Sequence, residues 1–229
     1  MWGKDSWGVP GLMELAAGSL ELVAGDRFAG AVGETVLSVA VAVALALVGG
    51  VIFGLVMGSS RFLATALGAP LEVIRPIPAL ALIPVAILML GQGVTMEVAI
   101  AAFGSWWPIL FNTSYGVRDV DTVALDAARA MGCSRLSRLV RVVLPSLLPS
   151  VLTGVRTAVP LTLVIVIAAE YLSTAQRGMG GVLITATSMG DMGVLWCTAL
   201  VAGLLGIALG SACDVIARSL TPWATRRNP

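Results

Sequence analysis

Long apolar stretches dominate the chain, and the short segments between them contain most of its charged residues. A helix needs roughly 20 mostly apolar residues to cross about 30 Å of hydrocarbon. Five stretches meet this requirement, at about Thr35–Met57, Val73–Leu90, Val94–Tyr115, Val151–Leu172 and Val194–Ile216. The pattern therefore predicts an all-α, polytopic membrane protein with five transmembrane helices.

Composition supports the membrane class and excludes several others. Hydrophobic residues make up 58% of the 229 residues and charged residues 12%, whereas soluble domains are about 45–50% apolar and 25% charged. Mean hydropathy is +0.96. A net charge of +1 gives no basic surface for nucleic acid. Without histidine and with three widely spaced cysteines, the chain is expected to have neither metal ligands nor catalytic residues.

Basic residues gather on one side of the predicted membrane and so predict its orientation, because Lys and Arg concentrate in short cytoplasmic loops. The loop after the first span, the loop after the third span and the C-terminal tail together hold 11 of the 14 basic residues and five of the 13 acidic ones. The opposite side holds three basic and eight acidic residues. We therefore expect the N-terminus outside and the C-terminus in the cytoplasm.

The first 30 residues alternate polar and apolar positions too often to span a membrane. Trp2 and Trp7 suit a helix that lies in the membrane interface, and no cleavable signal is recognisable in this region. The expected division is residues 1–30 as an extracytoplasmic segment, residues 31–216 as the transmembrane domain and residues 217–229 as a cytoplasmic tail.

The loop at 116–150 is long and patterned as two short helices. The first has an apolar stripe at Val123, Ala127, Ala130 and Met131. Its candidate N-caps are Asp119, Asp121 and Thr122. Gly132 is suited to end this helix, and Ser134 to cap the second. The second helix carries a basic stripe, Arg135, Arg138 and Arg141, and is expected to end at Leu144-Pro145. Amphipathicity alone would favour a pair of surface helices without a partner.

One run in this loop has a distinctive spacing: Asp126-Ala127-Ala128, three residues, Gly132, nine residues, Val142, one residue, Leu144-Pro145. It resembles the EAA loop of binding-protein-dependent ABC importer permeases, in which the pattern is Glu-Ala-Ala, three residues, Gly, nine residues, Ile, one residue, Leu-Pro. Every spacing matches. Asp126 stands in place of the usual Glu, and Val142 in place of Ile.

Two further regions resemble the nitrate/sulfonate/taurine branch of that family. They are the proline-rich stretch from Arg75 to Pro84, and Glu170 with the glycines at Gly178 and Gly180-Gly181. The resemblance covers roughly residues 30–216. Many such permeases have an additional N-terminal span, and no stretch upstream of Thr35 is apolar enough to be one.

The resemblance implies a type I ABC importer permease fold and a set of partners. These are two ABC ATPase subunits that bind the ATP, a second permease copy forming a homodimer, an extracytoplasmic solute-binding protein and the lipid bilayer of a bacterial cytoplasmic membrane. The chain itself would need no cofactor. A coupling helix around Asp126–Gly132 would dock on the ATPase. The residues expected to serve ATPase coupling are Asp126, Ala127, Ala128, Met131, Gly132, Leu144 and Pro145.

A second group of residues is a candidate for the transport pathway or a gate: Arg75, Pro76, Pro78, Pro84 and Glu170. Prolines break helices, and broken helix at membrane depth is tolerated where protein or water covers it. The second span therefore either lines the pathway or is merely kinked. Glu170 is either a gate residue or a solvated or helix-capping residue at the outer end of the fourth span.

Glycines at Gly50, Gly54 and Gly58, and at Gly206 and Gly210, predict close helix–helix contacts. The alternative function is a self-contained carrier or channel driven by an ion gradient. Such proteins usually have charged residues at the middle of their spans, and the five predicted spans lack them there. The sequence therefore favours an importer subunit, whose transported solute it does not identify.

Overall fold

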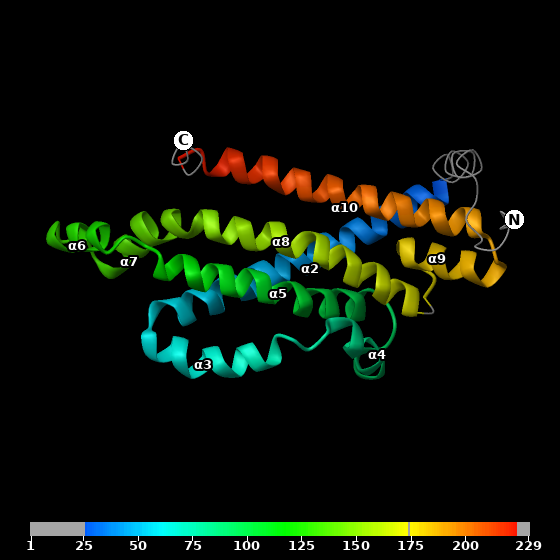
Figure 1. Ribbon diagram of the computed structural model, residues 1–229, viewed down its shortest axis with the longest axis horizontal. Coiled ribbons are helices and arrows are strands. Elements are labelled where there is room, and N and C mark those ends of the chain that lie inside the picture. The colour runs from blue at the N-terminus through cyan, green and yellow to red at the C-terminus, as the bar shows by residue number, and fades with distance from the viewer. Residues whose placement is uncertain (1–25, 174, 224–229) are drawn as a thin grey trace, which may run out of the picture. The chain divides into compact units, whose positions relative to one another are not determined.

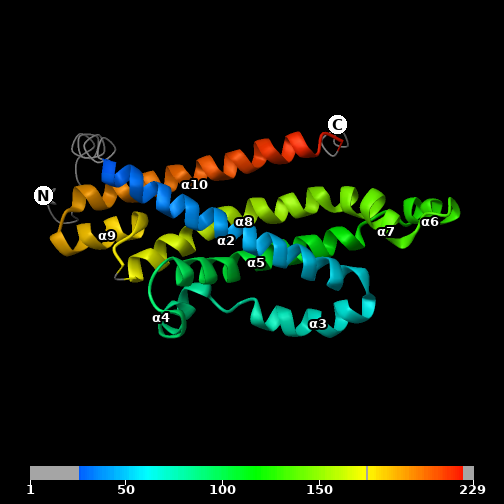
Figure 2. The same ribbon diagram turned by 180° about the vertical axis from the view of Figure 1, so that it is seen from behind.

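The computed structural model describes residues 26–173 and 175–223, which form helices joined by short connections (Figures 1 and 2). Within these ranges, four helices are long and apolar enough to cross a membrane: α2 (Asp26–Ser59), α5 (Val94–Arg118), α8 (Leu144–Leu172) and α10 (Met192–Leu220). The shorter helices are α3 (Arg61–Ile74), α4 (Ile83–Leu90), α6 (Thr122–Ala130), α7 (Arg135–Arg138) and α9 (Gly178–Met189). The all-α, polytopic expectation is confirmed.

The chain divides into two compact units, and each of the four long helices contributes to both. Unit 1 contains the described residues up to Ala42, together with Ala79–Ala101 and Thr162–Ala208. Unit 2 contains Val43–Pro78, Ala102–Leu161 and the described residues from Leu209 onward. The loop around α6 belongs to unit 2, and the surroundings of Glu170 belong to unit 1.

Within unit 2, α2 and α5 pack closely through the predicted glycines. A Cβ atom added to Gly50, Gly54 or Gly58 would lie 2.8, 2.6 or 2.7 Å from the side chains of Ile109, Thr113 and Val117 respectively. Such distances are too short for carbon atoms, so only glycine permits this approach. The predicted contact is therefore confirmed for the first glycine series.

The second glycine series does not behave in the same way. A Cβ on Gly206 would make an ordinary 3.4 Å contact with Leu163, and one on Gly210 would meet nothing within 4 Å. Neither glycine is required by packing against the residues that the structure describes. The sequence pattern of spaced glycines was the same in both helices, so it did not distinguish the two cases.

The second predicted span, Val73–Leu90, is broken, as its prolines indicated: the helices Phe62–Ile74 and Ala79–Leu90 are together long and apolar enough to cross a membrane but are bent by 71°. Helix α3 begins at Arg61, with Ser60 as its N-cap, and ends at Ile74. The chain then passes through Arg75–Pro78, forms a 3₁₀ turn at Ala79–Leu82 and continues as α4. Two prolines in three residues remove backbone donors and disfavour helical geometry in the residues before them. The apolar pattern alone does not register this break.

The fourth predicted helix begins earlier than expected. The helix starting at Arg135 does not end at Leu144-Pro145; it passes through a π-helical turn, Leu139–Val143, directly into α8. In that turn the Leu144 amide donates to the Leu139 carbonyl. The π turn lies directly before Pro145, where the proline ring and its missing N–H disfavour the regular α-helical bonding pattern.

Because α8 starts at Leu144, Arg156 is the thirteenth of its 29 residues. Arg156 therefore lies inside a long helix and forms an ion pair with Asp214 of α10, with 2.8 Å between Nε and Oδ1. Asp214 lies only six residues before the end of α10, so the ion pair lies toward that end of the helix, and the expectation that the middles of the spans lack charged residues stays a prediction. Hydropathy averages conceal such a residue when its neighbours are strongly apolar.

Two other boundaries differ from the sequence prediction. Helix α2 begins at Asp26, so the boundary proposed at residue 30 lies within a helix, and the interfacial helix expected at residues 1–30 falls mostly outside the described residues. Helix α9, absent from the prediction, ends at Met189 and is capped by Gly190, whose φ of 71° is left-handed. At 12 residues α9 is too short to cross the membrane.

Candidate functional site

Helix α6 has a defined cap at each end. The Asp121 carboxylate accepts a hydrogen bond of 2.9 Å from the Val123 amide at its start. At its end the Gly132 amide donates to the Arg129 carbonyl, and the Cys133 amide to the Ala128 carbonyl. This pair of bonds with Gly132 at φ 75° is a Schellman motif. Of the three candidate caps, Asp121 is the one used.

The apolar stripe predicted on α6 faces away from the protein. Val123 is 72% exposed and Met131 is 76% exposed, and Ala127 and Ala130 are also exposed. Asp126 is exposed and pairs with Arg129 at 2.8 Å. Ala128, by contrast, is buried and points inward. Ala127 is therefore at the free surface of α6, whereas Ala128 supports the helix from behind.

Helices α6 and α7 lie beyond the adjoining ends of α5 and α8 (Figures 1 and 2). Ser134 caps α7 by accepting a hydrogen bond from the Ser137 amide. The remaining members of the predicted coupling group, Leu144 and Pro145, are exposed at the start of α8. A cavity of about 460 Å³ lies behind α6, with Leu125 of α6 and Leu139 and Val143 of the π turn in its apolar wall.

The four candidate residues of the proline-rich segment are exposed, although Ile83 within that segment is buried. Arg75, Pro76, Pro78 and Pro84 all lie at the surface of the chain. The Arg75 guanidinium lies 5.0 Å from the centre of the Phe111 ring, within cation–π range. No contact within the described residues joins the four into a site, so their role in a pathway stays a prediction.

Side chains from two other helices bind the first three amides of α9. Gly178 N donates to Glu34 Oε2 at 3.0 Å, Met179 N to Thr35 Oγ1 at 2.9 Å, and Gly180 N to Glu170 Oε2 at 2.9 Å. Thr35 Oγ1 also lies 2.9 Å from both carboxylate oxygens of Glu170. These groups occupy the donors that a helix N-terminus leaves free, and the carboxylates suit its positive dipole end. We call Glu34, Thr35 and Glu170 the α9 clamp.

The glycines beside Glu170 are needed for this geometry. Gly178 has a φ of 63°, and a Cβ there would collide with the Glu170 carboxylate. A Cβ on Gly180 would collide with the Glu170 Cβ and with the Tyr171 backbone. Glu170 is only 1% exposed. Its capping of α9 was one of the alternatives drawn from the sequence, and a gating role stays a prediction.

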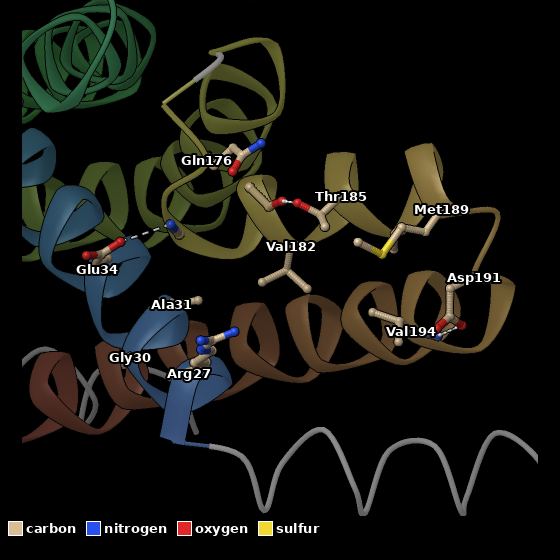
Figure 3. A pocket seen from close by; sticks show the side chains of 13 residues that line it. Arg27, Gly30, Ala31, Glu34, Gln176, Val182, Thr185, Met189, Asp191 and Val194 are labelled. Atoms are coloured by element: carbon tan, nitrogen blue, oxygen red, sulfur yellow. Dashed lines mark hydrogen bonds between the residues drawn. The ribbon is translucent and has the colours of Figure 1, made fainter.

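A cavity of about 520 Å³ adjoins the α9 clamp (Figure 3). Arg27 and Ala31 of α2, Val182 of α9 and Asp191 at the start of α10 line it, along with Glu34. Glu34 also forms an ion pair of 3.3 Å with Arg177. A cationic group and two carboxylates on a partly apolar wall are able to hold a small polar solute.

Glu97 is a second buried acid, 1% exposed, in the first turn of α5. A carboxylate is favourable at this end of a helix dipole. Its Oε1 atom has no hydrogen-bond partner within the described residues.

Sequence reasoning missed Glu34 and Thr35 as site residues. Thr35 was taken only as the start of an apolar stretch, although it contacts Glu170 across 135 positions of sequence. No local pattern indicates such a partnership. The presence of a single acid next to closely spaced glycines was the one available signal, and it located Glu170 but not its partners.

Comparison with known proteins agrees with the sequence resemblance. The family model of the binding-protein-dependent transport system inner membrane component matches residues 46–226. A protein of Escherichia coli, provisionally named as an aliphatic sulfonates transport permease, is 34% identical over 170 residues, which are 74% of this chain and 63% of that protein. The nitrate import permease of Leptolyngbya laminosa is 28% identical over 184 residues, 80% of this chain and 66% of that protein.

The fold also matches a solved structure. A chain of the MetNI methionine ABC transporter, in an inward-facing conformation, superimposes with a TM-score of 0.75 at 19% identity, covering 85% of this chain and 96% of the other. This confirms the expected type I importer permease fold. The chain spans about two-thirds of the length of the curated relatives it matches. The match over residues 46–226 shows that the chain belongs to the family of binding-protein-dependent transport system inner membrane components.

Proposed function

We propose that the chain is the membrane permease subunit of an ATP-driven importer and that α6 couples it to a partner ATPase. The observation that carries this proposal is the exposed apolar stripe on a helix capped at both ends. Exposed Val123 and Met131 on a nine-residue helix would be unfavourable in water unless another surface covers them. Family membership supplies the kind of protein that would do so.

In this proposal two ATPase subunits bind and hydrolyse ATP, and the permease itself performs no chemistry. Each ATPase would bind α6 through Val123, Ala127 and Met131. Asp126 would help to fix the position of the helix, and Gly132 would fix the point at which it ends. Ala128 and Leu125 would transmit the force because they face the protein interior. Leu144 and Pro145 would pass it into α8. ATP-driven closure of the ATPase pair would then switch the permease between inward- and outward-open states.

The proposed assembly places the chain in a bacterial cytoplasmic membrane. The N-terminus would be outside and the C-terminus in the cytoplasm, following the distribution of basic residues. A second copy would complete the pathway as a homodimer, and an external binding protein would deliver the solute.

Nitrate and sulfonates, which appear in the names of the relatives, indicate small oxyanions as the substrate class. Arg75, Pro76, Pro78, Pro84 and Glu170 are the proposed pathway or gate residues.

The alternative is an ion-gradient-driven carrier, in which the Arg156–Asp214 ion pair, toward the end of α10, could serve ion coupling. The opposite charges of Arg156 and Asp214 neutralise each other, however, and the Glu170 carboxylate already accepts a hydrogen bond from the Gly180 amide of α9. Family membership favours the importer. Purified without an ATPase, the chain should neither hydrolyse ATP nor accumulate solute under an ion gradient.

Replacing Ala127 with Trp tests the docking role. The chain is co-expressed with a candidate ABC ATPase from the same genome, and co-purification and ATP hydrolysis are measured in lipid vesicles. Ala127→Trp should abolish most ATPase retention while the permease stays folded in the membrane, because a large side chain blocks close approach at the stripe. Ala199→Trp, at an exposed alanine of α10, is the matched control and should retain the ATPase. Equal retention by both variants would contradict the proposal.

A further inference from the structure

A groove in unit 2 lies between facing residues of α8 and α10 and has a volume of about 200 Å³. Thr153 and Arg156 line it from α8, and Asp214, Arg218 and Thr221 from α10. None of these residues belongs to the proposed coupling surface or to the α9 clamp. The groove is thus a separate feature of the molecule.

The groove has more basic than acidic groups. Arg156 uses Nε to bind Asp214 at 2.8 Å, and its terminal amino groups have no hydrogen-bond partner within the described part of the chain. Arg218 pairs with no described residue. Both threonine hydroxyls donate to carbonyls of their own helices, Thr153 to Pro149 and Thr221 to Ala217. The donors left for a ligand are therefore guanidinium groups, which bind phosphate oxygens well.

The position of the groove indicates the depth of a lipid headgroup. Arg218 lies in the last turn of α10, a helix able to span the membrane. Trp223, three residues beyond that helix, is 51% exposed. Tryptophan and arginine at the end of a span are typical of the membrane–water interface. A phosphate at this level would belong to a lipid more naturally than to a solute in transit.

We propose that the groove between α8 and α10 binds the phosphate of an anionic membrane lipid. Arg218 and the free amino groups of Arg156 hold the phosphate oxygens, and Asp214 orients Arg156 while limiting the net charge of the groove to one positive unit. The inference does not depend on the proposed transport function. It assigns a ligand to a surface that the coupling mechanism leaves unused.

The test measures lipid retained by the purified full-length chain in native mass spectrometry. Phosphatidylglycerol, phosphatidylcholine and inorganic phosphate are titrated separately. The wild type should retain phosphatidylglycerol in preference to phosphatidylcholine. Arg218→Gln should lower phosphatidylglycerol occupancy about fivefold, as expected for one basic group at an anionic membrane surface. Arg135→Gln, at an exposed arginine outside the groove, is the matched control and should leave it unchanged.

Asp214→Asn makes the test sharper, because it should change binding in the opposite direction. Removing the carboxylate frees the whole Arg156 guanidinium, so phosphatidylglycerol occupancy should rise, whereas damage to the fold would lower it. Arg218→Lys, which keeps the charge, should restore part of the binding. Equal retention of both lipids, or equal losses in Arg218→Gln and Arg135→Gln, would overturn the proposal. Full displacement of lipid by inorganic phosphate would overturn the lipid as the source of the phosphate.

Discussion

At the scale of single residues, Glu170 illustrates how a buried acid is accommodated. An isolated carboxylate would be unfavourable in a protein interior, but Glu170 accepts hydrogen bonds from a helix N-terminus and lies beside the Thr35 hydroxyl. The acid and its glycines were visible in the sequence. Its threonine partner was not, because the contact depends on how α2 and α8 pack within unit 1.

Replacing Gly180 with Ala tests whether the α9 clamp depends on close packing. The added methyl group would collide with the Glu170 side chain and with backbone atoms of Tyr171 and Ile167, which cannot move independently. We expect a loss of about 1–3 kcal/mol, typical of overpacking, seen as a lower melting temperature of the purified chain by circular dichroism.

Gly203→Ala is the control for that substitution. A methyl group on Gly203 would meet nothing within 4 Å, and alanine in a helix interior is favoured over glycine by roughly 0.5–1 kcal/mol. Stability should therefore rise slightly. If Gly180→Ala were equally harmless, the close packing against Glu170 would not be a determinant of stability.

At the scale of elements, apolar length predicted where helices exist better than where they begin or end. The spans matching α2, α5, α8 and α10 were identified, because an unbroken apolar run is a strong signal. The prolines at 76 and 78 break the second span, whereas Pro145 does not end a helix, because the π turn directly before it replaces the regular α-helical bonding that proline disfavours. The same residue type thus had opposite effects, decided by the backbone hydrogen bonds around it.

Gly132→Ala tests how much the C-terminal cap at Gly132 stabilises α6. Gly132 has a left-handed φ of 75°, a conformation that disfavours a side chain by about 1–2 kcal/mol. We expect faster amide hydrogen exchange in α6 and weaker ATPase retention. Gly68→Ala in α3, where a methyl group would have open space, is the control, and an unchanged exchange rate in Gly132→Ala would show that α6 does not need this cap.

At the scale of the whole molecule, composition predicted a membrane protein and the charge asymmetry predicted its orientation. The spacing from Asp126 to Pro145 indicated the family. The α6 surface, the candidate site with the clearest sequence pattern, could be located in advance because its contacts are local. The α9 clamp and the groove between α8 and α10 could not, because each joins residues far apart in the sequence. Patterns therefore located the surface that we propose faces a partner, but not the residues of the α9 clamp or of the groove.

The orientation of the chain in the membrane is tested by labelling from one side. The three native cysteines are first replaced with serine, and a single cysteine is introduced at Ser188 of α9 or at Met131 of α6, both exposed. In intact bacteria that express the chain, a membrane-impermeant maleimide should label Ser188→Cys, whereas Met131→Cys should react only after the membrane is opened. The reason is the excess of basic residues on the α6 side, which favours the cytoplasm. Labelling of Met131→Cys in intact cells would place α6 outside, where no ATPase could reach it, and the coupling proposal would fail with the orientation.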